Sequence, residues 1–479
     1  MHSEHADSRP DPDQALINIA EYVTGYEIAS PEPYRMARYC VMDALGCAME
    51  ALNFPECTKL LGPVVPGMSI VRGARVPGTR FELDPVSAAF NLGTMIRWLD
   101  FNDTFAAADA GHPSDNLGGV LATADYLSRG RIAEGKSPLL MRDVLTMLIK
   151  AYEIQGVLSL ENSFTRLGFD YITLTRVAAA AVVTRMLGGS REEVINAVSN
   201  AWADGVSLKI YRQGANTGPR KSWAGGDATS RGVRLALMAI KGDMGYPSVL
   251  TAKTFGVHEA FFRGNPLKFQ RPYGHYVVER VVFKFVPAGT LGQTAAECAF
   301  RLHSQVKDRL NDIEAITISS HETLLGIMDK SGPLSNPADR DHCVRYVVAV
   351  GLIHGKISTA NFDDAFASDP RIDTLRGKMT VVEDPRYTRD YVDPDKRSNA
   401  NAIEVRFRDG SSAPKMEIEY PLGHSRRRAD AMPMLEAKFN SHLARRFSSK
   451  QQTAIIDIFA DQARFEATPV DEFVDRFVV

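Results

Sequence analysis

The sequence has no long apolar run and few cysteines. No stretch of about 18 or more consecutive apolar residues occurs, so we expect no transmembrane helix. The five cysteines form no CxxC pair, which favours free thiols in a reducing compartment over a disulfide framework. Their wide spacing also disfavours the ligand set of an iron–sulfur cluster.

A charge excess of either sign is also absent. The chain has 56 Lys and Arg residues against 58 Asp and Glu residues, a net charge of −2, which argues against nucleic acid as a partner. No Walker or GxGxxG pattern occurs, so a nucleotide ligand is not favoured. The first residues lack both an apolar signal core and the Arg-rich, acid-poor character of a transit peptide, so we expect a cytoplasmic protein without membrane contact.

What the sequence does contain is a dense group of ionisable side chains at residues 97–119, RWLDFNDTFAAADAGHPSDNLGG. Unpaired buried charges cost on the order of several kcal/mol, so this composition favours an active-site loop; a solvated Asx-rich turn is the alternative. His112 is the best acid–base candidate, because its reference pKa lies near neutral pH and Pro113 restricts its backbone. Asp100 and Asp103 would share one face if this segment were helical.

A second stretch, residues 204–231, places cations among Gly, Asn, Ser and Thr. Clustered cationic donors suit an anion with several carboxylates or phosphates. A basic surface loop is the alternative. Its cations are Lys209, Arg212, Arg220, Lys221 and Arg231.

The periodicity predicts a mainly α protein with a smaller α+β domain. Residues 14–275 are helical in pattern, and Ser190 and Glu193 predict a capping box at a helix start. Residues 276–423 alternate with period two in places, and the two apolar runs on either side of Asp409 and Gly410 predict a hairpin. Residues 424–479 return to helical patterning, so we expect C-terminal helices that pack back on the first domain.

Several motifs together resemble the MmgE/PrpD family, the 2-methylcitrate dehydratases, to which cis-aconitate decarboxylases also belong. These motifs are LDFNDT with GHPSDN, NTGPRKSWAGGDATSR, FQRPYGHYVVERVVFKFVP, YCVMDALGCAMEAL, NPADRDHC and YPLGHSRRR. The resemblance implies a large helical domain made from both chain ends, an α+β lid, and an active site in the cleft between them. It also implies a homodimer that acts on a small tricarboxylate without metal or cofactor.

Dehydration of a citrate needs a base, cations that hold the developing charge, and an acid for the leaving hydroxyl. His112 and one of the two aspartates suit the acid–base roles, and Lys221 suits a substrate carboxylate. Lys284 is a lone lysine in the apolar run VVFKFVP, so it either snorkels or faces an anion. We therefore predict as catalytic Asp100, Asp103, His112, Lys221 and Lys284, and as substrate-binding Asn102, Tyr171, Gln213, Arg220 and Tyr273.

The sequence departs from the family pattern around this site. Phe105 and Ala110 replace tryptophans, and Tyr171 and Gln213 replace histidines. The lid pattern FPAEFH becomes residues 286–291, VPAGTL. These changes suggest a larger and less polar pocket, so we hypothesise an alkylcitrate substrate with a substituent longer than methyl. Decarboxylation of a cis-aconitate is the enzymatic alternative, and an inactive scaffold paralogue is the alternative from another class.

Overall fold

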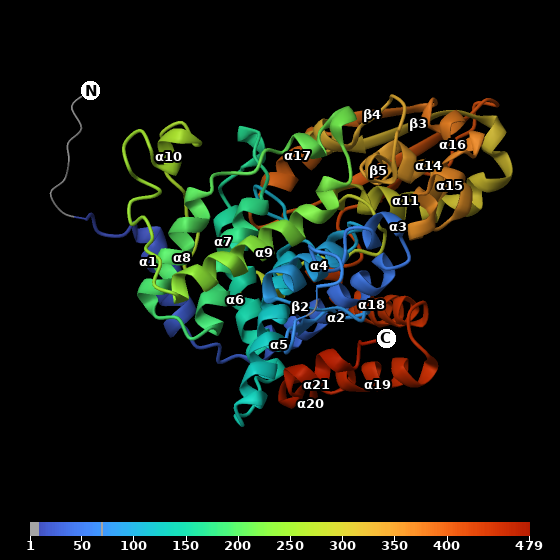
Figure 1. Cartoon of the computed structure of the whole chain (residues 1–479). Coiled ribbons are helices and arrows are strands. Elements are labelled where there is room, and N and C mark those ends of the chain that lie inside the picture. The colour runs from blue at the N-terminus through green and yellow to red at the C-terminus, as the bar shows by residue number, and fades with distance from the viewer. Residues whose placement is uncertain (1–8, 69) are drawn as a thin grey trace.

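The computed structural model describes residues 9–68 and 70–479. The protein consists of a helical body and a smaller domain whose helices and sheet lie between residues 293 and 418, called the lid below (Figure 1). This confirms the predicted class of a mainly α protein with a smaller α+β domain. The body contains the short pair β1 (Ala74–Arg75) and β2 (Glu82–Leu83). Its helices from the first part of the chain are α1 (Gln14–Gly25), α2 (Pro31–Ala51), α3 (Pro55–Thr58), α4 (Pro85–Arg97), α5 (Leu117–Ala133), α6 (Met141–Ser159), α7 (Ile172–Met186), α8 (Arg191–Ala203), α9 (Arg220–Ile240) and α10 (Val257–Ala260).

The centre of the body is built from α4, α7 and α9. Helix α7 is apolar on almost every face and is buried among its neighbours, as its composition predicts. Helix α8 begins with the predicted capping box, in which the Ser190 hydroxyl accepts from the Glu193 amide at 3.3 Å and the Glu193 carboxylate accepts from the Ser190 amide at 2.7 Å. The predicted start of that helix is therefore confirmed.

Helices α4 and α9 approach backbone to backbone. A Cβ on Gly93 would lie 2.8 Å from the Cα of Gly226, so neither position has room for a side chain. The end of α4 at Arg97 and the start of α9 at Arg220 consequently lie near one another. The loops that follow α4 and precede α9 carry most of the predicted site residues.

The lid contains a sheet of order β4-β3-β5-β6. Strand β3 (Ile313–Ser320) pairs in parallel with β4 (Met379–Glu383) and antiparallel with β5 (Asn401–Phe407), which pairs antiparallel with β6 (Met416–Ile418). The last pair is the predicted hairpin, and its second strand ends at Ile418. The lid helices are α11 (Gln293–Val306), α12 (Glu322–Met328), α13 (Pro337–Arg340), α14 (Val344–His354), α15 (Asp364–Ala367), α16 (Pro370–Arg376) and α17 (Pro385–Val392).

The chain returns to the body in α18 (Arg428–Ala444), α19 (Ser449–Ala460), α20 (Gln462–Ala467) and α21 (Val470–Asp475), drawn red in Figure 1. Helix α18 packs on α2, and the Lys438 ammonium lies 2.7 Å from the Asp43 carboxylate. The same ammonium donates to the carbonyls of Phe101 and Lys284, which ties the C-terminal helices to the loops of the site. In the part of the chain that the structure describes, no helix has the length and apolar character to cross a membrane.

Candidate active site

The segment after α4 is an irregular turn, not a helix. Asp100 has φ of 50°, in the left-handed region that non-glycine residues rarely adopt. The expectation that Asp100 and Asp103 share a helical face is therefore wrong. The carboxylate of Asp103 accepts from the hydroxyls of Ser114 at 2.9 Å and Tyr152 at 2.7 Å, and the side chain is buried away from the cavity.

Cations surround the carboxylate of Asp100. Its Oδ1 pairs with the Arg97 guanidinium and lies 2.9 Å from Lys284 Nζ and 3.2 Å from His112 Nε2. Lys284 also donates to the Asp100 carbonyl at 2.8 Å, which holds the unusual turn. Burial alone would raise the pKa of Asp100, but Arg97 and Lys284 hold it well below its usual range. Burial lowers the pKa of Lys284 to about 8, so this lysine is charged at neutral pH.

His112 is buried at the edge of this group, directly before Pro113. Burial, together with the charges of Arg97 and Lys284, lowers its pKa well below the usual value, so the ring is neutral at neutral pH. Its Nε2 faces Asp100, and its buried Nδ1 has no hydrogen-bond partner among residues 9–68 and 70–479. A neutral imidazole with one nitrogen held by a carboxylate suits a proton acceptor.

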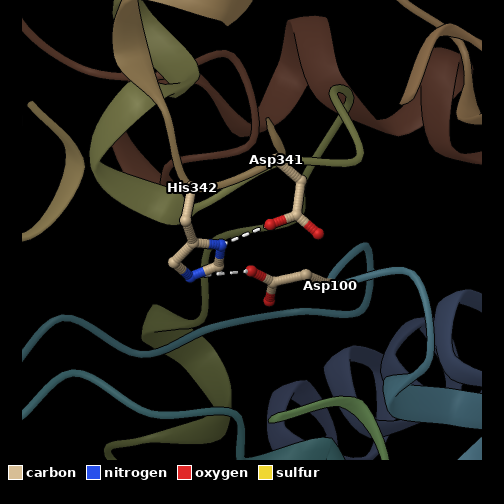
Figure 2. Close-up of side chains that lie close together, drawn as sticks. All are labelled: Asp100, Asp341 and His342. Carbon is tan, nitrogen blue, oxygen red and sulfur yellow. Dashed lines mark hydrogen bonds and ion pairs between the residues drawn. The ribbon is translucent and has the colours of Figure 1, made fainter. Parts of the chain in front are cut away.

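The lid contributes Asp341 and His342 to the same place (Figure 2). Lys221, in the first turn of α9, lies 2.5 Å from the Asp341 carboxylate and 2.9 Å from His342 Nδ1. The opposite ring nitrogen, His342 Nε2, lies 3.5 Å from Asp100 Oδ2. Burial and the nearby Lys221 lower the pKa of His342 to about 4, so this ring is neutral as well. Body and lid therefore meet in one ion-pair network.

Asp100, Asp341 and His342 offer possible metal-ligand atoms that all lie within 4.8 Å of one another. Both carboxylates of this group already accept from a lysine. The Lys284 ammonium pairs with Asp100, and the Lys221 ammonium contacts both Asp341 and His342.

A cavity of about 960 Å³ opens on this network, and residues of both body and lid line it. Asp100 and His112 lie in its polar wall together with Arg97, Tyr171 and His342. The remaining wall is mixed, with charged side chains such as Asp109, Lys209 and Arg212 beside small and aliphatic ones. The small and aliphatic side chains are Ala107, Ala108, Ala110, Leu208, Ile210, Leu291, Ile327 and Met328.

The departures from the family pattern contribute unequally to this cavity. Ala110, Tyr171, Gln213 and Leu291 line it, whereas Phe105 is buried beside it against Tyr276. Of the two positions at which the family pattern has tryptophan, only Ala110 lines the cavity.

Gly289 also lines the cavity, on the lid side. A Cβ there would lie 2.9 Å from the sulfur of Met328, which fills the space that a side chain at 289 would occupy. The lid segment consequently presents a thioether to the cavity in place of a polar group.

The predicted site residues fall into four groups. Asp100, His112, Tyr171 and Gln213 line the cavity, and Lys221 and Lys284 lie buried directly behind its polar wall. Asn102 is buried with Asp103, and its amide donates to Ser114 and Asp115. The remaining two, Arg220 and Tyr273, lie outside the cavity lining.

Arg220 is exposed and stacks on Trp223 at 4.3 Å. Tyr273 stacks on Tyr22 at a ring distance of 5.2 Å and lines a separate hollow with Arg271. Neither side chain contacts the Asp100 network.

Arg97, Arg212 and His342 are cavity residues that lie outside the predicted site set, although Arg212 is one of the cations noted at residues 204–231. Arg97 lies inside the predicted ionisable stretch, and its proximity to Asp100 in sequence was a usable signal. His342 lies in the NPADRDHC motif, but no pattern in the sequence indicates that the lid brings it to Asp100.

Comparison with known proteins gives one consistent result. Residues 17–270 match the N-terminal domain of MmgE/PrpD, and residues 286–463 match its C-terminal domain. The chain is 58% identical over 475 residues to 2-methylcitrate dehydratase of Cupriavidus necator, covering 98% of both chains. It is 55% identical over 483 residues to 2-methylcitrate dehydratase of Salmonella typhimurium, covering 100% of both. It is 43% identical over 480 residues to a 2-methylcitrate dehydratase-like protein of Aspergillus oryzae, covering 98% of this chain and 96% of the relative.

Proposed function

Since the chain belongs to the MmgE/PrpD family, we propose that it is a hydro-lyase that dehydrates 2-methylcitrate or a citrate with a longer alkyl substituent. The observation that carries this proposal is the Asp100 network, in which two neutral histidines and two lysines meet at the polar wall of a cavity between body and lid. Acid, base and cations within one buried group are what the elimination of water from a polycarboxylate requires.

The reaction breaks one C–H bond and one C–O bond, and the electrons of the C–H bond form the new C=C bond. We assign proton removal to Nδ1 of His112, because the ring is neutral and Nε2–H donates to Asp100, which leaves the lone pair of Nδ1 without a partner in the described chain. The hydroxyl must leave with a proton as water. His342 is suited to donate this proton from its Nε2–H, while its Nδ1 takes up a proton from the Lys221 ammonium 2.9 Å away, so that the ring stays neutral.

The apolar part of the cavity supports an alkyl substituent longer than methyl. Ala110, Leu291 and Met328 offer no hydrogen-bonding partner to a polar group, and each buried methylene contributes about 0.8 kcal/mol of binding. We therefore expect a preference for the citrates with longer chains.

Turnover of 2-methylcitrate, hexylcitrate and octylcitrate tests this, with absorbance of the unsaturated product and carbon dioxide release followed together. We expect absorbance without gas, and turnover of the longer citrates. Gas release from cis-aconitate would indicate a decarboxylase. No turnover of any citrate would overturn the dehydratase proposal.

The variant Ala110→Trp sharpens this test, because it fills the cavity wall with the side chain that the family pattern has there. We expect it to lower kcat/KM for octylcitrate roughly 10-fold or more and to leave 2-methylcitrate nearly unaffected. Phe105→Trp is the matched control, because Phe105 lies outside the cavity lining. Equal effects of Ala110→Trp on all citrates would contradict the proposed place of the alkyl chain.

The lysines at Asp100 and Asp341 also support a reaction without a metal ion, because they already neutralise the carboxylates. Turnover after treatment with a strong chelator and gel filtration tests this. Unchanged activity is expected, and restoration of lost activity by an added divalent cation would contradict it.

A further inference from the structure

Arg212 is a buried cation that does not take part in the Asp100 network. Arg212 is the last residue of the short 3-10 helix Ile210–Arg212 and is 6% exposed. Its Nε donates to Asp170 Oδ2 at 2.5 Å. Neither terminal nitrogen of the guanidinium has a hydrogen-bond partner among the described residues, and Nη2 is fully buried. An unpaired buried N–H is unfavourable, so its retention points to an acceptor that arrives with a ligand.

Arg212 lies in the wall of the same cavity as the Asp100 network. Arg212 lines the cavity, and its guanidinium carbon lies 5.5 Å from the centre of the Tyr171 ring. The Tyr171 hydroxyl lies 3.4 Å from Arg97 Nε, and Arg97 pairs with Asp100. One tyrosine ring therefore separates Arg212 from the Asp100 network, along the same cavity wall.

We propose that Arg212 binds one carboxylate of the substrate and makes the enzyme selective for tricarboxylates over dicarboxylates. This inference rests on the proposed function, and it names the group that anchors the substrate at a distance from the reacting carbon. The planar guanidinium matches a carboxylate in a two-point contact through its terminal nitrogens. Asp170 fixes the guanidinium through Nε, so little side-chain freedom is lost when the carboxylate binds.

The other cations of the cavity are less suited to this role. Lys209 already contacts the hydroxyl of Thr165, and Arg397 donates to the carbonyl of Leu160 at 3.3 Å. Arg166 is exposed at the outer part of the cavity. Arg212 combines burial, a fixed orientation and two terminal nitrogens without a partner in the described chain.

Binding of tricarballylate, propane-1,2,3-tricarboxylate, tests the inference without any turnover, because this ligand lacks the hydroxyl that a dehydratase removes. Calorimetry would compare it with glutarate and methylsuccinate, each of which lacks one of the three carboxylates. In Arg212→Gln we expect the Kd of tricarballylate to rise roughly 10- to 100-fold, the range for hydrogen bonds to charged groups. The dicarboxylate that lacks the carboxylate held by Arg212 should bind the variant and the wild type equally.

Two further variants separate this role from a structural one. Arg231→Gln removes an exposed arginine of α9 that pairs with Asp227, and it should leave all three Kd values unchanged. Arg212→Gln leaves Asp170 buried without its partner, so Arg212→Gln with Asp170→Asn removes both charges and guards against a folding defect. The double variant should show the same selective loss for tricarballylate.

Equal weakening of all three ligands in Arg212→Gln, or unchanged binding of tricarballylate, would overturn the inference. Failure of the wild-type enzyme to bind tricarballylate would overturn it as well. Arg212-dependent binding in a protein that dehydrates no citrate would instead overturn the proposed function and leave the carboxylate site standing.

Discussion

Asp100 and Asp103 are separated by two residues of the same loop, but cations surround the first carboxylate and hydroxyl groups surround the second. Asp100 pairs with Arg97 and Lys284, and these charges hold its pKa well below its usual range. Asp103 accepts from Ser114 and Tyr152, and burial together with the nearby Asp43 raises its pKa to about 7. Local sequence therefore says little about the charge of a buried carboxylate, because the partners come from distant segments.

The difference extends to the task that each aspartate can perform. Asp100 lines the cavity and contacts His112, so it can orient the His112 ring, which we propose as the base, toward a bound substrate. Asp103 ties the loop to α6 through Tyr152 and has no cavity contact. We interpret Asp100 as part of the reacting network and Asp103 as a residue that holds the loop in place.

The strongest test of this comparison is a matched pair of isosteric variants. Asp100→Asn removes the negative charge that orients His112, and we expect kcat/KM to fall roughly 100-fold or more. Asp103→Asn keeps a hydrogen-bonding side chain of the same shape, and we expect kcat/KM within about 3-fold of wild type. Steady-state kinetics with 2-methylcitrate measures both. A larger loss in Asp103→Asn than in Asp100→Asn, with both variants folded by circular dichroism, would reverse the assignment.

The cation beside Asp100 predicts a pH dependence. Because the pKa of Lys284 is about 8, its ammonium is present below that pH and is lost above it. We therefore expect kcat/KM to fall as the pH rises through about 8. In Lys284→Arg the guanidinium stays charged, so the remaining activity should show no such fall up to about pH 10.

Lys150 provides the control for this pH profile. Burial lowers its pKa to about 8 as well, but it donates to the Val23 carbonyl and does not line the cavity. Lys150→Arg should consequently keep the wild-type profile. An unchanged alkaline fall in Lys284→Arg would assign the titration to another group, such as Lys221.

The helices and strands could be predicted because their signals are local. Ser190 and Glu193 mark a helix start by their spacing, and Asp409 with Gly410 marks a hairpin turn. The turn at Asp100 could not be predicted, because Asp100 has a left-handed backbone and its carbonyl accepts from Lys284, a residue far along the chain. The spacing of three between Asp100 and Asp103 led us to consider a shared helical face, but the chain is not helical there.

The candidate site was predictable only where its ionisable side chains lie close together in one segment of the sequence. The residue types at 97–119 led to the selection of Asp100 and His112, and the structure places both on the cavity wall. His342 meets Asp100 only because the lid folds over the body, and no local pattern encodes that contact. Tyr171 and Tyr273 were selected alike as substrate-binding tyrosines, yet the fold directs one to the cavity and the other to a separate hollow.

The smallest expected effect concerns stability and again separates the two aspartates. The pKa of Asp103 is about 7 in the folded protein against an ordinary value of 3.8, so the folded state binds the extra proton between these values. The stabilisation from that proton is fully present below about pH 4 and is lost as the pH rises through 7. Asp103→Asn does not titrate, so the difference in Tm between wild type and variant should shift in favour of the variant from pH 5 to pH 8. Thermal unfolding at both pH values measures this shift, and a constant difference would show that Asp103 is already ionised at pH 5.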